Sequence, residues 1–187
     1  MIENGSNGSS ISVNRKCIEE SIDLNQPYLS VTERYYTPYY KIDQDRSRKN
    51  DLCLLIHSNR ISLITLAPSH PVLSSTEKIK VNCEVSGKLD RKQNKAVGKS
   101  KKGGQNLEPT SIVCFLEVGE TRYPIEAVSP GKLVCMNKCV LENPDFARLK
   151  PQAEGHIAVL LPYLGRIQVT QNNTLPFLLH YFSDTIF

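Results

Sequence analysis

The fold is decided by residues 111–126, which read SIVCFLEVGETRYPIE. Apolar, β-branched and aromatic side chains fill its two flanks, from Ser111 to Val118 and from Arg122 to Glu126. These residue types favour β-strands. Between the flanks, Gly119-Glu120-Thr121 has the length and the glycine of a tight turn. The stretch therefore predicts a β-hairpin.

Five further segments on either side of this hairpin predict strands, because they are short apolar or alternating runs. They cover residues 52–56, 61–66, 79–85, 132–136 and 156–161. A polar turn, His57-Ser58-Asn59-Arg60, separates the first two. One helix of about two turns is predicted from Glu142 to Leu149, where Asn143-Pro144 can start it. Seven short strands without a βαβ rhythm predict an all-β barrel or sandwich.

The β domain is expected to span residues 29–165 of the 187-residue chain. Residues 1–28 are rich in Ser, Asn, Gly and other polar residues, so we predict a disordered N-terminal segment. Residues 166–187 are expected to form a flexible tail. The chain begins without a signal-peptide pattern and has no apolar stretch near the ~20 residues of a spanning helix. We therefore expect an intracellular protein without membrane contact.

The formal net charge of +4 is unevenly distributed. Residues 88–102 contain one acid and seven basic residues, which are Lys88, Arg91, Lys92, Lys95, Lys99, Lys101 and Lys102. This segment carries +6, so the remainder of the chain carries −2. Two interpretations stay open. The segment is either a solvated protruding loop or a contact surface for a polyanion, which could be nucleic acid or an acidic protein such as a filament subunit.

A second unusual stretch is residues 34–41, RYYTPYYK, with four tyrosines in six residues. Tyrosines flanked by cations can stack on the bases of single-stranded nucleic acid. The alternative is an amphipathic strap whose rings pack against the domain while the hydroxyl groups stay in water. We favour the strap.

The sequence offers no catalytic or metal-binding constellation. It contains no G-x-S-x-G and no H-E-x-x-H motif, and we expect His57 and His70 to cap turns and His156 to be packed. Six cysteines without a C-x-x-C pair, with only four histidines, predict reduced and buried thiols and no metal site. We therefore expect no enzyme activity, no cofactor and no small-molecule substrate.

The second half of the chain resembles the glycine cleavage H protein and the biotinyl and lipoyl carriers. Residues 127–137 (AVSPGKLVCMN) and 154–159 (EGHIAV) carry this resemblance, and 85–89 and 101–107 resemble the matching half-repeat. It implies a barrel-sandwich hybrid (single hybrid motif). A carrier presents a modifiable lysine at a hairpin tip, but no lysine occurs between Lys102 and Lys132. A lipoyl or biotinyl cofactor at the Gly119-Glu120-Thr121 hairpin is therefore not expected.

A more specific resemblance is to the Abitram (actin-binding transcription modulator) family. It rests on residues 34–41, 57–66, 69–73 (SHPVL), 93–95 with 98–99, and 155–162 (GHIAVLLP). The resemblance implies a non-enzymatic protein that binds actin monomers and filaments, regulates actin polymerisation and modulates transcription. It also implies nuclear speckles, the cytoskeleton and cell projections (filopodia, lamellipodia, growth cones and dendrites) as locations. The alternative is a nucleic-acid-binding module in transcription or RNA processing that uses residues 88–102.

Overall fold

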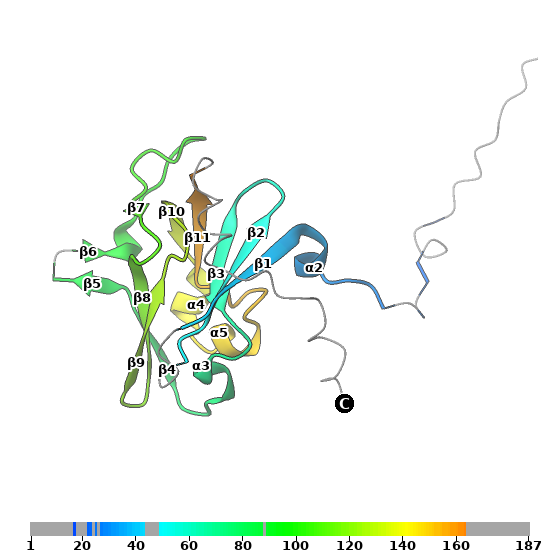
Figure 1. The fold of residues 1–187 in the computed structure, drawn as a ribbon, viewed down its shortest axis with the longest axis horizontal. Coiled ribbons are helices and arrows are strands. Elements are labelled where there is room, and N and C mark those ends of the chain that lie inside the picture. The colour runs from blue at the N-terminus through cyan, green and yellow to red at the C-terminus, as the bar shows by residue number, and fades with distance from the viewer. Residues whose placement is uncertain are drawn as a thin grey trace, which may run out of the picture.

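The computed structural model describes residues 17, 22–23, 25, 27–43, 49–87 and 89–163. Within them the chain is mostly β-sheet with a few short helices (Figure 1). The strands are β1 Tyr36–Lys41, β2 Leu52–His57, β3 Ser62–Leu66, β4 Ile79–Asn82, β5 Glu84–Ser86, β6 Leu89–Asp90, β7 Asn106–Leu107, β8 Ile112–Val118, β9 Thr121–Glu126, β10 Gly131–Met136 and β11 Ala158–Pro162. The helices are α2 Val31–Tyr35, α3 Pro71–Ser74, η1 Arg91–Gln93, α4 Lys138–Glu142 and α5 Phe146–Leu149. The predicted disordered segment 1–28 lies mostly, and the tail 166–187 wholly, outside the described residues.

The larger sheet has the strand order β1-β2-β3-β11-β10-β7, and all of its pairs are antiparallel. The predicted turn at residues 57–60 joins β2 to β3. His57 caps this turn as expected, since its Nδ1 accepts the backbone N–H of Asn59 at 3.0 Å. β1 forms one edge of the sheet, and the two-residue β7 forms the other.

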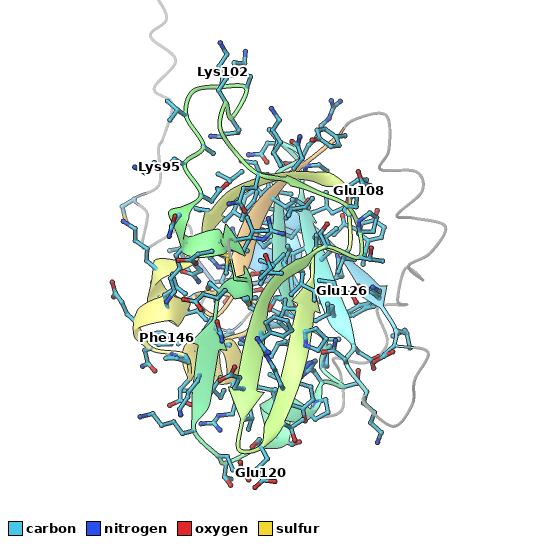
Figure 2. All side chains as sticks on the ribbon, turned by 90° about the vertical axis from the view of Figure 1, so that its left-hand side faces the viewer. Lys95, Lys102, Glu108, Glu120, Glu126 and Phe146 are labelled. Carbon is cyan, nitrogen blue, oxygen red and sulfur yellow. The ribbon has the colours of Figure 1, made fainter. Side chains whose placement is uncertain are left out.

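The predicted hairpin at residues 111–126 is confirmed as β8 and β9, which pair with β4 in a second antiparallel sheet. Gly119 at its turn has φ +57°, a conformation that glycine adopts without steric cost. Glu120 stands at the exposed tip, as Figure 2 shows. β5 and β6 form a separate two-stranded sheet.

The main hydrophobic core lies between the two sheets, and a smaller cluster of Tyr40, Cys53, Leu55 and Ala67 is separate from it. Leu54 and Ile64 from the larger sheet pack in one cluster with Leu116 and Ile125 from the smaller sheet. All four side chains are fully buried. Burying a side chain of this size contributes about 1.5–3 kcal/mol, so the buried side chains of β8 and β9 hold the second sheet on the first. The all-β prediction is confirmed, with open sheets.

Three local predictions were wrong. The helix predicted over residues 142–149 is two short helices, α4 and α5, because Asn143 ends α4 and its N–H bonds back to the Cys139 carbonyl. The strand predicted over 79–85 is interrupted at the buried Cys83. Cys135 and Cys139 are exposed, although Cys53 and Cys114 are buried as expected.

The tyrosine segment packs on the larger sheet as an edge strand, as the strap interpretation expects, but Tyr40 is buried together with its hydroxyl group instead of leaving that group in water. Tyr40 is buried, and Tyr36 and Tyr39 pack against the two core clusters. Tyr35 remains half exposed and stacks on the His57 ring at 6.0 Å between centroids. Burial raises the pKa of the Tyr40 hydroxyl to about 12. The rings of the segment therefore serve chiefly to attach β1.

Candidate partner-binding surface

The basic segment forms a protruding loop between η1 and β7, which we call the lysine loop (residues 94–105). Its two arms are joined at Val97 and Lys102, whose backbone groups exchange two hydrogen bonds of 2.9 Å each. Gly98 to Lys101 make the turn, and Gly98 and Lys101 have positive φ angles. Figure 2 shows the loop standing above the sheets with Lys95 and Lys102 pointing into solvent.

Asn94 fastens the base of the lysine loop to β10. β10 contains a bulge at Val134, where its register against β11 shifts by one residue. The Asn94 amide nitrogen donates to the carbonyl oxygens of Leu133 and Val134 at 2.9 and 3.0 Å, and its Oδ1 accepts the Gln105 N–H at 2.8 Å. The Asn94 side chain thereby supplies hydrogen bonds to the β10 carbonyl groups beyond the end of β7, and it links the two ends of the loop.

Arg91 is a structural residue of the same base, so its prediction as a partner contact was wrong. It is only 6% exposed, and its Nε and Nη2 donate to the Ile112 carbonyl at 3.2 and 3.1 Å. Its Nη1 donates to Gln105 Oε1 at 2.6 Å. Burial lowers the pKa of the Arg91 guanidinium. The side chain therefore holds η1 against β8 and the loop.

The remaining predicted contacts do not lie on one surface. Lys95, Lys99 and Lys102 are exposed on the lysine loop, and Lys101 there is half-buried. Lys92 is exposed too, but it lines a separate cleft. Lys88 lies outside the described residues.

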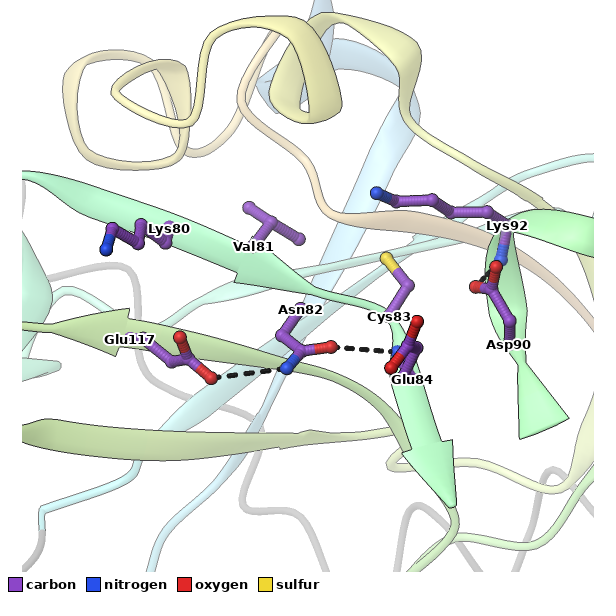
Figure 3. Close-up of a pocket in the computed structure, with 8 residues that line it drawn as sticks. All are labelled: Lys80, Val81, Asn82, Cys83, Glu84, Asp90, Lys92 and Glu117. Carbon is purple, nitrogen blue, oxygen red and sulfur yellow. Dashed lines mark hydrogen bonds between the residues drawn. The ribbon is translucent and has the colours of Figure 1, made fainter. Parts of the chain in front are cut away.

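The cleft at Lys92 has a volume of about 270 Å³ and lies between β4, β5 and β6 (Figure 3). Its walls carry both cations and carboxylates, together with Asn82, which donates to Glu117 at 3.3 Å and accepts the Glu84 N–H at 3.0 Å. Burial raises the pKa of Cys83 in this cleft to about 11. Ligand pockets are usually 300–1,000 Å³ and mostly apolar. This small polar cleft does not fit that description.

The sequence pattern did not indicate two further lysines, Lys132 and Lys138, because they lie well beyond the loop along the chain. Lys132 of β10 reaches the Ser100 carbonyl of the loop with its Nζ at 3.4 Å. Lys138 begins α4, two residues after β10 ends at Met136. Burial raises the pKa of the nearby Cys135, and the charges of Lys101 and Lys138 act against this rise. The antiparallel pairing of β10 with β7 brings Lys132 to the loop, and no sequence pattern indicates this pairing.

The tyrosines lie at the other edge of the larger sheet. β1 and β10 are separated by three strands, which places them roughly 20 Å apart at about 4.8 Å per strand. A single platform that combines the tyrosines of β1 with the lysine loop is therefore excluded.

The residues that could have suggested a hydrolase are engaged in structural contacts. His70 caps α3 by accepting the Val72 N–H at Nδ1 (3.2 Å), as predicted for a capping histidine, and its Nε2 bonds to Asn50 at 2.9 Å. Ser69 donates to Asp51 at 2.6 Å. Burial lowers the pKa of His70 to about 4. These contacts tie residues 50–51 to α3.

The described residues contain neither a membrane-spanning helix nor a metal-binding cluster. None of the described helices is long and apolar enough to cross a membrane. The same residues contain no group of three or more His, Cys, Asp or Glu side chains that could hold a metal ion.

Curated relatives share the described domain. The chain is 42% identical to Protein Abitram of Danio rerio over 135 residues, which covers 71% of this chain and 76% of the relative. It is 41% identical to the Homo sapiens protein of the same name over 136 residues, with coverage of 71% and 75%. The Dictyostelium discoideum protein of that name is 30% identical over 139 residues, with coverage of 72% and 77%.

Among solved structures, the fold resembles a glycine cleavage system H protein from Mycobacterium marinum. The TM-score is 0.45 at 11% identity, and the match covers 66% of this chain and 83% of that one. No protein-family profile matches the chain.

Proposed function

The chain belongs to the Abitram family, and on this premise we propose that it is a non-enzymatic interaction protein that binds actin monomers and filaments and modulates transcription. We propose that the protein acts both at nuclear speckles and at the actin-rich cytoskeleton of cell projections. The actin partner follows from the resemblance of residues 34–41, 57–66 and 155–162 to the family, as set out above.

The observation that best supports a partner-binding role is the lysine loop. Lys95, Lys99 and Lys102 are exposed on a loop whose base is held by the hydrogen bonds of Asn94 and Arg91. A held loop loses little conformational entropy on binding, so more of the contact energy appears as affinity. Its cations create a positive field that attracts an acidic protein surface and is screened over about 8 Å at physiological salt.

Co-sedimentation with actin filaments and a monomer-binding titration test this proposal. The variant changes Lys95, Lys99, Lys101 and Lys102 together to glutamine. The control changes an equal number of exposed lysines outside the loop to glutamine, namely Lys49, Lys78, Lys80 and Lys150. We expect the loop variant to lose binding in both assays and the control to retain it. Wild-type protein that binds neither filaments nor monomers would refute the actin role.

A nucleic-acid-binding function is the second candidate, and the same exposed lysines support it. Phosphate contacts make affinity fall steeply with salt, with a slope of about −0.7 per phosphate neutralised on a single strand. A gel-shift titration at several salt concentrations measures this slope. Binding that is tight at physiological salt and disappears in the loop variant would favour this function over the actin role.

A further inference from the structure

We propose that the lysine loop and the junction of β10 with α4 form one composite docking surface for an acidic polypeptide, in which Val97 is the apolar contact. This inference deepens the proposed function and rests on it for the existence of a protein partner. It adds Lys132, Lys138 and Val97 to the surface and specifies the chemistry of the segment that binds.

The two parts of the surface are joined by direct contacts. Lys132 reaches the Ser100 carbonyl at the loop tip, and Asn94 bonds the loop base to the β10 bulge at Val134. On the far side of the bulge, Cys135 is exposed, and the exposed Lys138 begins α4 two residues after β10 ends at Met136. Burial raises the pKa of Cys135, and the charges of Lys101 and Lys138 act against this rise. Cations from the loop, from β10 and from α4 therefore surround one region of the surface.

Val97 adds an exposed apolar side chain to this otherwise charged surface. It is 68% exposed although its neighbours in the loop are mostly charged or small. It pairs with Lys102 across the bridge, and residues paired in this way project to the same side of the ribbon. Protein interfaces combine an apolar centre with a polar rim, which is the arrangement of Val97 beside lysines.

The composition of the surface favours a carboxylate-bearing polypeptide over nucleic acid. Readers of base edges rely on arginine, and single-strand binders add aromatic rings. The one arginine of this region, Arg91, is buried, and residues 91–105 contain no aromatic residue. The tyrosines of β1 belong to the opposite edge of the sheet, and Tyr163, which lies beside β7, donates its hydroxyl to Asn106 Oδ1 at 2.7 Å. Lysine ammonium groups are point charges that pair with carboxylates, and Val97 adds affinity for an apolar side chain next to them.

The test uses three labelled probes of equal length and the full chain. The first is a 15-residue peptide of glutamate and serine. The second has the same glutamates but leucine in place of three serines, and the third is oligo-dT of 15 nucleotides. Binding is measured by fluorescence anisotropy at physiological salt for wild type, Val97→Ser, the double variant Lys132→Gln/Lys138→Gln, and the control Lys78→Gln/Lys80→Gln.

We expect wild type to bind the leucine-containing peptide more tightly than the other two probes. Val97→Ser should remove the difference between the two peptides. Lys132→Gln/Lys138→Gln should weaken both peptides about threefold to tenfold, because each exposed ion pair contributes little, while the control stays unchanged. Circular dichroism melts confirm that each variant is folded.

Three results would overturn the inference. Oligo-dT could bind more tightly than both peptides, which would make the surface a nucleic-acid site. Lys132→Gln/Lys138→Gln could behave like the control, which would restrict the surface to the loop. Wild type could bind neither peptide. The actin assays are separate, so a failure of co-sedimentation would refute the proposed function, whereas these peptide measurements decide the composite surface.

Discussion

Replacing Arg91 by alanine should destabilise the fold rather than remove a partner contact. Truncation leaves two acceptors without their donor, the Ile112 carbonyl and Gln105 Oε1. A buried acceptor left unsatisfied costs about 1–3 kcal/mol. The gain from no longer burying a guanidinium offsets part of this loss. We therefore expect the free energy of unfolding to fall by about 3 kcal/mol.

Thermal and urea denaturation followed by circular dichroism measure this change. For a domain of this size, about 3 kcal/mol corresponds to a melting temperature lower by roughly 6–12 °C. The control is Lys95→Ala, since an exposed loop lysine should change stability by less than about 0.5 kcal/mol. The reasoning is refuted if Arg91→Ala melts like wild type and yet loses partner binding, because Arg91 would then be a contact residue.

Three further predictions concern other parts of the fold. Burial lowers the pKa of His70 in the folded protein to about 4, whereas its pKa in the unfolded chain is about 6.5. As the pH falls from about 6.5 to 4, the unfolded chain therefore binds a proton before the folded protein does. The free energy of unfolding falls over this pH range. Urea titrations should show wild type losing about 2 kcal/mol from this group between pH 8 and 5, a loss absent in His70→Asn, and parallel curves for the two proteins would contradict it. In Gly103→Ala the new Cβ would lie 2.6 Å from the Lys95 carbonyl oxygen, at a residue whose φ of +78° is strained for alanine. Because the loop must shift to relieve this, we expect the variant to bind the peptides more weakly. Unchanged binding in the anisotropy assay would count against a rigid loop. Native protein should expose three of its six thiols to a chromogenic disulfide reagent, Cys17, Cys135 and Cys139, and a count of one would show that the β10–α4 junction is covered.

Strand positions could be predicted from the sequence because burial of one face imposes a local pattern. The strand-forming residues of 111–118 and the glycine at position 119 were sufficient to predict the β8–β9 hairpin. The turn at residues 57–60 and the capping role of His70 were likewise readable, since each depends on neighbours within a few residues. The basic run itself was visible as a count of charges.

The composition of the site was decided by the tertiary structure. Arg91 and Lys95 look equivalent in the sequence, but one donates into the base of the loop and the other points into solvent. Lys132 joins the surface only because β10 pairs with β7 and brings it beside Ser100. A local sequence pattern indicates which side of a strand is buried. The hydrogen-bond partner of a lysine or arginine side chain depends instead on which carbonyl groups, distant in the sequence, the packed sheets bring close to it.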